Sequence, residues 1–107
     1  MTDNIKSQMR KGMLDYCILL CVSKQEAYTN DLLGQLKDAG LLVMEGTLYP
    51  LLSRMKNNGW LTYRWQESTE GPPRKYYDIT PEGRQMLQEL ENEWEAISAS
   101  VNKIANN

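Results

Sequence analysis

Residues 61–79 read LTYRWQESTEGPPRKYYDI, and this stretch decides the fold because the hydrophobic period of the chain changes within it. Every second residue from Leu61 to Trp65 is apolar and the residues between them are polar, which is the pattern of a strand with one buried face. Residues 67–73, ESTEGPP, are turn formers that end such a strand. Residues 74–79, RKYYDI, therefore predict the returning strand of a hairpin.

Three segments with helical spacing precede the hairpin. The first is apolar around much of its circumference, so it lies either at the centre of the core or at an interface. Apolar residues at the spacing i, i+4, i+7 form one stripe along it and indicate the helix. That stripe consists of Met9, Met13, Tyr16, Cys17 and Leu20. After a polar connection over residues 23–26, a second helix is predicted from Ala27 to Ala39, ended by a left-handed Gly40.

The third helix carries the cleanest amphipathic stripe of the chain, formed by Leu48, Leu51, Leu52 and Met55. Pro50 is compatible with this helix if it lies near the first turn, where a backbone amide lacks a partner inside the helix. The dipeptide Asn58-Gly59 predicts the end of the helix.

A long last helix follows the hairpin, from Pro81 to about Lys103. Thr80 is a suitable N-cap, and proline is favoured at the position after it. Apolar residues then recur at intervals of three and four, which is the heptad seam of a helix that packs against a partner helix. The seam residues are Leu87, Leu90, Trp94, Ile97, Val101 and Ile104. The alternative is a seam buried wholly within one chain, but 107 residues provide only a small core to cover it.

Composition excludes several classes of function. The chain has no histidine, which removes histidine-based catalysis and histidine metal sites, and we expect neither an enzyme nor a cofactor. Cys17 and Cys21 are predicted as reduced core residues of a cytoplasmic protein; a two-cysteine metal or redox site is the alternative, and no further ligands accompany the pair. No apolar run is long enough to span a membrane, and no secretory signal is recognisable.

Charge is distributed unevenly along the chain. Residues 82–107 contain two basic and five acidic residues, whereas residues 54–75 contain five basic and two acidic ones. A net charge of −2 would by itself argue against a partner that is a polyanion, but local patches matter more than the total. The pattern predicts a basic working face on an otherwise acidic protein.

The predicted order helix–helix–helix–hairpin–helix is that of a winged helix-turn-helix. We therefore expect a mainly α protein with a small β-hairpin (α+β), in which residues 1–80 form the DNA-binding part and residues 81–107 a C-terminal dimerisation helix, together one compact unit. In this architecture the third helix enters the major groove and the hairpin contacts the flanking backbone. The candidate DNA-binding residues are Arg10, Lys11, Thr47, Tyr49, Pro50, Ser53, Arg54, Lys56, Arg74 and Lys75. Trp60 and Trp65 are interpreted as packing residues of the hairpin.

Three classes of function fit this order of elements. The first is a sequence-specific transcriptional regulator that binds a near-palindromic double-stranded operator as a homodimer. The second is a winged-helix module that binds another protein. The third is a dimer that sequesters a drug or metabolite without specific DNA binding.

Several runs of residues resemble the PadR family of bacterial transcriptional regulators. They are EGTLYPLLSRM at 45–55, NGWL at 58–61, GPPRKYY at 71–77 and ITPEGR at 79–84, and the resemblance extends over about residues 8–105. It implies a homodimeric repressor whose affinity for its operator changes when a ligand binds. Because only one helix follows the hairpin, the chain resembles the short branch of the family, which contains multidrug-responsive members.

The resemblance to the short branch also implies an effector site. In that branch a tryptophan of the last helix faces its symmetry mate across a flat pore, and Trp94 occupies the matching position. The implied effector-binding residues are Met13, Tyr16, Cys17, Met86, Leu90 and Trp94. Tyr16 is bulkier than the residue expected in this branch and Glu91 replaces an aromatic residue, so the pore is narrower, closed or selective for another ligand. A small planar aromatic compound is the implied effector.

Overall fold

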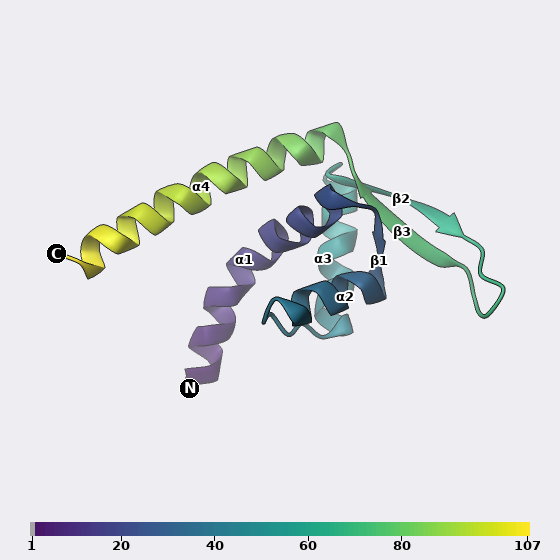
Figure 1. Cartoon of the computed structure of the whole chain (residues 1–107), viewed down its shortest axis with the longest axis horizontal. Helices are drawn as coiled ribbons and strands as arrows, with labels where there is room; N and C mark the ends of the chain where they lie inside the picture. The colour runs from purple at the N-terminus through teal and green to yellow at the C-terminus, as the bar shows by residue number, and fades with distance from the viewer. Residues whose placement is uncertain (1) are drawn as a thin grey trace.

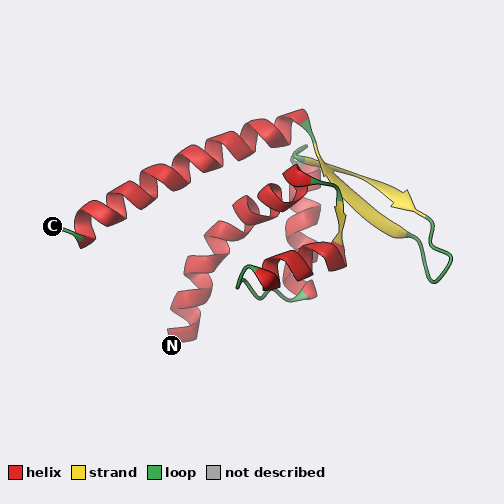
Figure 2. Ribbon diagram, viewed as in Figure 1, coloured by secondary structure: helices red, strands yellow, loops and turns green. Residues whose placement is uncertain are grey.

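The computed structural model describes residues 2–107, which form four helices and one small sheet (Figures 1 and 2). The elements in chain order are α1 (Thr2–Lys24), β1 (Ala27–Tyr28), α2 (Thr29–Asp38), α3 (Glu45–Asn57), β2 (Leu61–Gln66), β3 (Arg74–Ile79) and α4 (Pro81–Ala105). The predicted fold class, a mainly α chain with a small β part arranged as a winged helix, is confirmed.

The sheet is antiparallel with the strand order β1-β3-β2. The hairpin has the predicted bounds, and its register pairs Leu61 with Ile79 at the base and Gln66 with Arg74 near the tip. The prediction that the second helix begins at Ala27 was wrong. Ala27 and Tyr28 instead form β1 and pair with β3, because this places the Ala27 side chain in the core and the Tyr28 ring 5.4 Å from that of Tyr76.

The face of α1 that meets the core is not the stripe from which the helix was predicted. The structure buries Leu14, Ile18, Leu19 and Val22, which lie in one core with side chains of α2, α3 and the hairpin. Met9 is 80% exposed, and the other members of the predicted stripe are only partly buried. Both faces of this helix are apolar, so spacing alone did not distinguish the face that meets the core.

Helix ends follow the sequence signals closely. Gly40 and Gly59 adopt positive φ angles of 93° and 83° directly after α2 and α3 have ended. Pro50, however, is the sixth residue of α3 and not part of its first turn, contrary to the prediction. Its missing amide leaves the carbonyl of Gly46 without a helical donor. Gly46 is exposed, so water can supply the donor.

The junction between β3 and α4 is tightly built. The backbone amide of Thr80 donates to the Trp60 carbonyl at 3.0 Å, and its hydroxyl caps α4 by accepting from the Gly83 amide at 2.9 Å. Gly83 is buried, and a Cβ built on it would lie 2.1 Å from the Trp60 carbonyl oxygen. The glycine therefore allows the first turn of α4 to lie directly against the backbone that connects α3 with β2.

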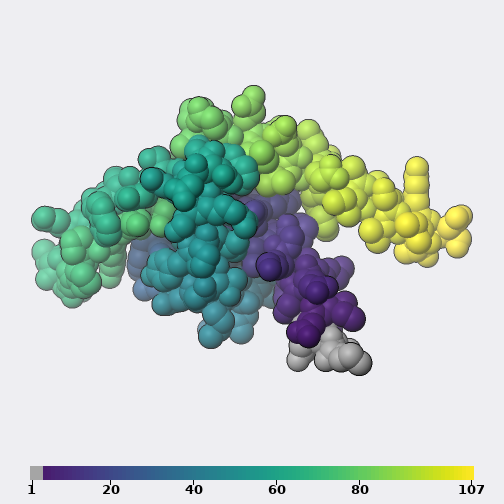
Figure 3. Space-filling model, turned by 180° about the vertical axis from the view of Figure 1, so that it is seen from behind, coloured from purple at the N-terminus to yellow at the C-terminus, as the bar shows by residue number. Residues whose placement is uncertain are grey.

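Only the first part of α4 lies against the body of the protein. Met86, Leu87 and Leu90 pack on the core, whereas Trp94, Ile97, Val101 and Ile104 are 45–79% exposed. In Figure 1 the two long helices diverge toward their free ends, and in Figure 3 the C-terminal half of α4 extends beyond the body. The radius of gyration is 15.6 Å, against about 13 Å for a compact chain of this length. The seam is therefore not buried within its own chain, and that alternative was wrong.

Three further observations concern the described residues. None of their helices is long and apolar enough to cross a membrane. Cys17 and Cys21 are free thiols on α1, and partial burial raises the pKa of both. Residues 2–107 contain no cluster of three or more cysteine or acidic side chains that could hold a metal ion.

Candidate nucleic-acid interface

The outer face of α3 is the centre of the site. Leu48, Leu52 and Met55 are buried on its inner side, so the residues between them project outward. Tyr49 is 49% exposed although it is a large apolar side chain. The other predicted contacts of this helix are all exposed: Thr47, Pro50, Ser53, Arg54 and Lys56.

A groove of about 380 Å³ separates α3 from the hairpin, and we call it the wing groove. Tyr49 and Ser53 line it from α3, and Arg74 and Lys75 line it from β3. Four residues predicted to contact DNA therefore share one concave surface. Two are on α3 and two on β3, at least 21 positions later in the chain. The complete lining is Tyr28, Thr29, Asn30, Tyr49, Ser53, Trp65, Pro73, Arg74, Lys75 and Tyr77.

Aromatic rings hold the cations of the wing groove. The Nζ atom of Lys75 lies 4.3 Å from the centroid of the Tyr63 ring and 5.2 Å from that of Trp65. The guanidinium of Arg74 lies 4.7 Å from the Tyr28 centroid. A cation over an aromatic face is oriented but keeps its charge. These two charges are thus positioned without being neutralised, as a phosphate-binding surface requires.

Arg74 and Lys75 occupy opposite faces of the hairpin. Lys75 is the register partner of Trp65, and both side chains lie on the face that lines the wing groove. Arg74 shares the other face with Arg64 and reaches the groove from its edge, over Tyr28. Arg64 itself is bound to the Glu26 carboxylate, whose pKa falls because of that hydrogen bond. A charge neutralised in this way is a poor candidate for phosphate contact, although it belongs to the same hairpin.

Arg54 is paired with an acidic side chain in this structure. Its guanidinium donates to Asp15 on α1 at 2.5 Å, so an ion pair connects α3 with α1. Arg54 keeps 54% of its side-chain surface exposed, and the pair lies at the edge of the outer face of α3. The sequence could not indicate this pairing, because the two residues are 39 positions apart.

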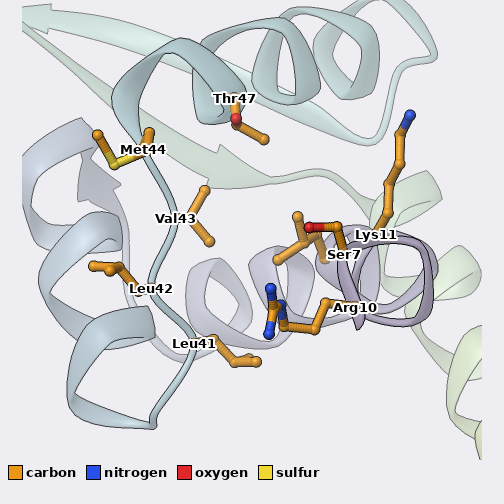
Figure 4. Close-up of a pocket in the computed structure, with 9 residues that line it drawn as sticks. Ser7, Arg10, Lys11, Leu41, Leu42, Val43, Met44 and Thr47 are labelled. Carbon is orange, nitrogen blue, oxygen red and sulfur yellow. The ribbon is translucent and has the colours of Figure 1, made fainter. Parts of the chain in front are cut away.

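Arg10, Lys11 and Thr47 lie together on the other side of α3. They line a second groove, of about 360 Å³, between α1 and the 41–44 segment that connects α2 with α3 (Figure 4). We call it the α1–loop groove. Its complete lining is Ser7, Arg10, Lys11, Leu14, Leu41, Leu42, Val43, Met44 and Thr47. The ten predicted DNA-binding residues thus fall on α3 itself and on the two grooves beside it.

Six residues of the wing groove were not predicted as site residues, and two of them are aromatic side chains that contact its cations. Trp65 is 61% exposed at the groove, although its position in the strand predicted packing. The hairpin extends past the body of the protein (Figure 1), so the alternation of apolar and polar residues continues beyond the part of the strand that meets the core. Tyr28 lies in the segment that was predicted as the second helix, and only the pairing of β1 with β3 places it beside Arg74.

The residues implied as an effector site lie on α1 and α4. Met13, Tyr16, Cys17, Met86 and Leu90 are partly buried within the single chain, whereas Trp94 is 45% exposed. Burial raises the pKa of the Tyr16 hydroxyl, and the Glu91 and Glu95 carboxylates raise it further. Tyr16 therefore lies near the Glu91 and Glu95 carboxylates of α4.

Comparisons with known proteins agree on one family. The family model described as "Transcriptional regulator PadR-like family" matches residues 18–89. A PadR-like transcription factor from Bacteroides fragilis is 56% identical, with a TM-score of 0.81 over 94% of this chain and 98% of the other. A PadR-like regulator from Bacillus cereus is 39% identical, with a TM-score of 0.85 over 94% and 99%. A PadR family regulator from Eggerthella lenta is 32% identical, with a TM-score of 0.89 over 96% and 90%.

Proposed function

The chain belongs to the PadR-like family of transcriptional regulators, and on that basis we propose that it is a homodimeric repressor that binds a near-palindromic operator. Family membership itself makes it a DNA-binding regulator and not an enzyme. The repressor role, the dimer, the residues that contact DNA and an action in the cytoplasm are the proposed parts.

The wing groove is the observation that carries this proposal. The exposed face of a helix is the element that fits the major groove of DNA, which is about 12 Å wide. Beside that face, Lys75 and Arg74 carry oriented and unneutralised charges on a hairpin that can reach the flanking phosphates. In this arrangement Tyr49 and Ser53 meet base edges, whereas the hairpin sets the orientation of the protein on the duplex.

The exposed half of α4 supports the dimer. Trp94, Ile97 and Val101 form an apolar stripe that its own chain does not cover, and Ile5 and Met9 of α1 are exposed as well. A second copy that packs its own α1 and α4 against these helices would cover both stripes. Two copies related by a twofold axis would then present two α3 helices to successive turns of one DNA face.

An effector site between the two α4 helices completes the proposal. Paired Trp94 side chains would offer an aromatic platform for a small planar compound, and Glu91 and Glu95 would favour a positive charge on it. Because the same helices would hold the dimer, a ligand between them would change the spacing of the two α3 helices. We propose that such a compound releases the repressor from DNA.

Selection of bound fragments from random-sequence duplex DNA tests the function directly. We expect one inverted repeat to be enriched, and its affinity to fall steeply as salt concentration rises. Ser53→Ala is expected to change the preference among operator variants, because Ser53 lies at the centre of the outer face of α3. Absence of any enriched sequence would favour a protein-binding module or a ligand-sequestering dimer instead.

A further inference from the structure

The segment between α2 and α3 has a composition that the proposed function does not explain. Residues 41–44 read LLVM, four consecutive apolar residues without regular secondary structure. Leu42 and Met44 are 73% and 69% exposed, whereas Leu41 and Val43 are partly buried against the core. Connecting segments are usually polar, so an exposed aliphatic segment of this kind calls for a partner.

The opposite wall of the α1–loop groove is cationic. Ser7, Arg10, Lys11 and Leu14 have the spacing i, i+3, i+4 and i+7, so they share one face of α1. Figure 4 shows the side chains of Ser7 and Arg10 directed into the space between α1 and the 41–44 segment. Neither Arg10 nor Lys11 forms an ion pair with any side chain that the structure describes, and no acidic residue lines the groove.

This face of α1 carries Arg10 and Lys11, which are already predicted to contact DNA, but it is separate from the proposed dimer contact and from the wing groove. Ile5, Met9 and Tyr16 lie on the opposite side of the helix, by their spacing from Leu14, and that side is available to the proposed dimer. The wing groove lies on the other flank of α3 and shares no lining residue with the α1–loop groove. A ligand here would therefore occupy neither the dimer contact nor the wing groove.

The residues that line the α1–loop groove indicate which kind of ligand it can bind. Two cations attract an anion, and the remaining walls are aliphatic, with no aromatic ring on which a planar ligand could stack. A volume of about 360 Å³ is at the lower end of small-molecule sites. We propose that the α1–loop groove binds medium-chain aliphatic carboxylates, with the carboxylate at Arg10 and Lys11 and the chain along Leu41 and Val43. Lys11 is exposed and points away from Arg10 in this structure (Figure 4), so its side chain would turn toward the carboxylate.

Binding at this place would also compete with DNA, a consequence that rests on the proposed function. The carboxylate and a DNA phosphate would compete for the same side chains, those of Arg10, Lys11 and Thr47. The binding step itself does not depend on DNA, so it is tested on the free protein.

The test is a titration of the full ¹⁵N-labelled chain with octanoate, followed by amide chemical shifts, with 1-octanol as the uncharged ligand of equal chain length. We expect saturable shifts in residues 41–47 and at Arg10. We also expect octanoate to bind roughly tenfold more tightly than octanol, as two exposed ion pairs would produce. Shifts confined to residues 94–104, or equal affinity for the two ligands, would overturn the proposal.

Two surface variants and one control assign the groove. Arg10→Gln is expected to weaken octanoate binding about fivefold and to leave octanol binding unchanged. Leu42→Glu is expected to weaken it at least as much, because it places a negative charge at the rim; both side chains are exposed, so folding is retained. Lys24→Gln removes an equal charge about 21 Å further along the same helix, at 1.5 Å per residue, and should have no effect. Equal losses in Arg10→Gln and Lys24→Gln would mean that only net charge matters, and the assigned site would be wrong.

Discussion

The guanidinium of Arg54 lies 2.5 Å from the carboxylate of Asp15, so an ion pair fastens the exposed side of α3 to α1. One Asp15 oxygen accepts from Arg54, and the other is buried without a hydrogen-bond partner. A partly exposed carboxylate with one oxygen that lacks a hydrogen-bond partner contributes little to stability. It is nevertheless paired with Arg54, a cation at the edge of the outer face of α3. The pair therefore places a negative charge beside Arg54 at the edge of the outer face of α3.

Asp15→Asn is expected to raise DNA affinity about fivefold, because it frees Arg54 and removes a negative charge near the phosphates. The free energy of unfolding should change by less than about 1 kcal/mol, since the pair is partly exposed. Operator titration and chemical denaturation measure the two quantities. Asp38→Asn removes an equal charge at the end of α2 and serves as the control. A decrease of affinity in Asp15→Asn would show that the pair positions α3 for binding.

Lys75→Ala is expected to weaken binding to every duplex by a similar factor and to reduce the slope of log affinity against log salt by about 1, as the loss of one phosphate contact does. Arg64→Ala removes a cation from the same hairpin, but from the face where Glu26 already neutralises it. That control should bind DNA as the parent does. Equal losses in the two variants would indicate that the hairpin acts through its net charge and not through the wing groove.

Ile97→Asp is expected to convert the dimer into a folded monomer. Ile97 is 47% exposed in the single chain, so the substitution leaves the core of each chain intact but places an unpaired charge in the α4 seam, at a cost of several kcal/mol to association. Sedimentation measures the mass, and circular dichroism verifies the fold. Ala99→Asp adds the same charge at an exposed position on the opposite side of α4 and should remain dimeric. A parent protein that is already monomeric at micromolar concentration would refute the dimer.

Trp94→Ala is expected to abolish binding of planar cationic dyes while the dimer and its DNA affinity persist. The parent should bind such dyes saturably, since stacking on paired indoles adds about 0.5–1.5 kcal/mol beyond area burial. Tryptophan emission follows the binding, and the variant isolates the contribution of Trp94 from those of Trp60 and Trp65. Equal dye affinity in the two proteins would mean that Tyr16 and Leu90 fill the space between the helices.

Gly83→Ala is expected to destabilise the fold by about 1–3 kcal/mol, because the added Cβ would lie 2.1 Å from the Trp60 carbonyl oxygen and 2.7 Å from the Ile79 side chain. Gly34→Ala has open space around its added methyl group and improves the helix propensity of α2, so it should stabilise by up to about 1 kcal/mol. Urea denaturation of the two variants and the parent gives the comparison. An unchanged free energy of unfolding in Gly83→Ala would show that the first turn of α4 can shift without loss of stability.

Most of the fold was predictable because the relevant signals are local. The strand alternation at Leu61–Trp65, the glycines that end α2 and α3, and the Thr80 cap each act within one turn or one hairpin, and each was confirmed. The sequence also singled out the basic residues Arg74 and Lys75 of the hairpin, and the structure places both at the wing groove. Their contact with DNA stays a prediction. These features depend on backbone conformation and side-chain type, which neighbouring residues determine.

Long-range contacts decided the rest. Spacing could not distinguish the two apolar faces of α1, because the choice depends on which face α2 and the hairpin cover. It could not reveal β1, whose two residues form a strand only because β3 offers them a free edge. Nor could it separate Arg54 and Arg64, which carboxylates of distant residues neutralise, from Lys75, which aromatic rings hold without loss of charge. The sequence determined which charges the chain carries, and the tertiary structure decided which of them remain available, because the environment of a charge is set by whatever the fold places beside it.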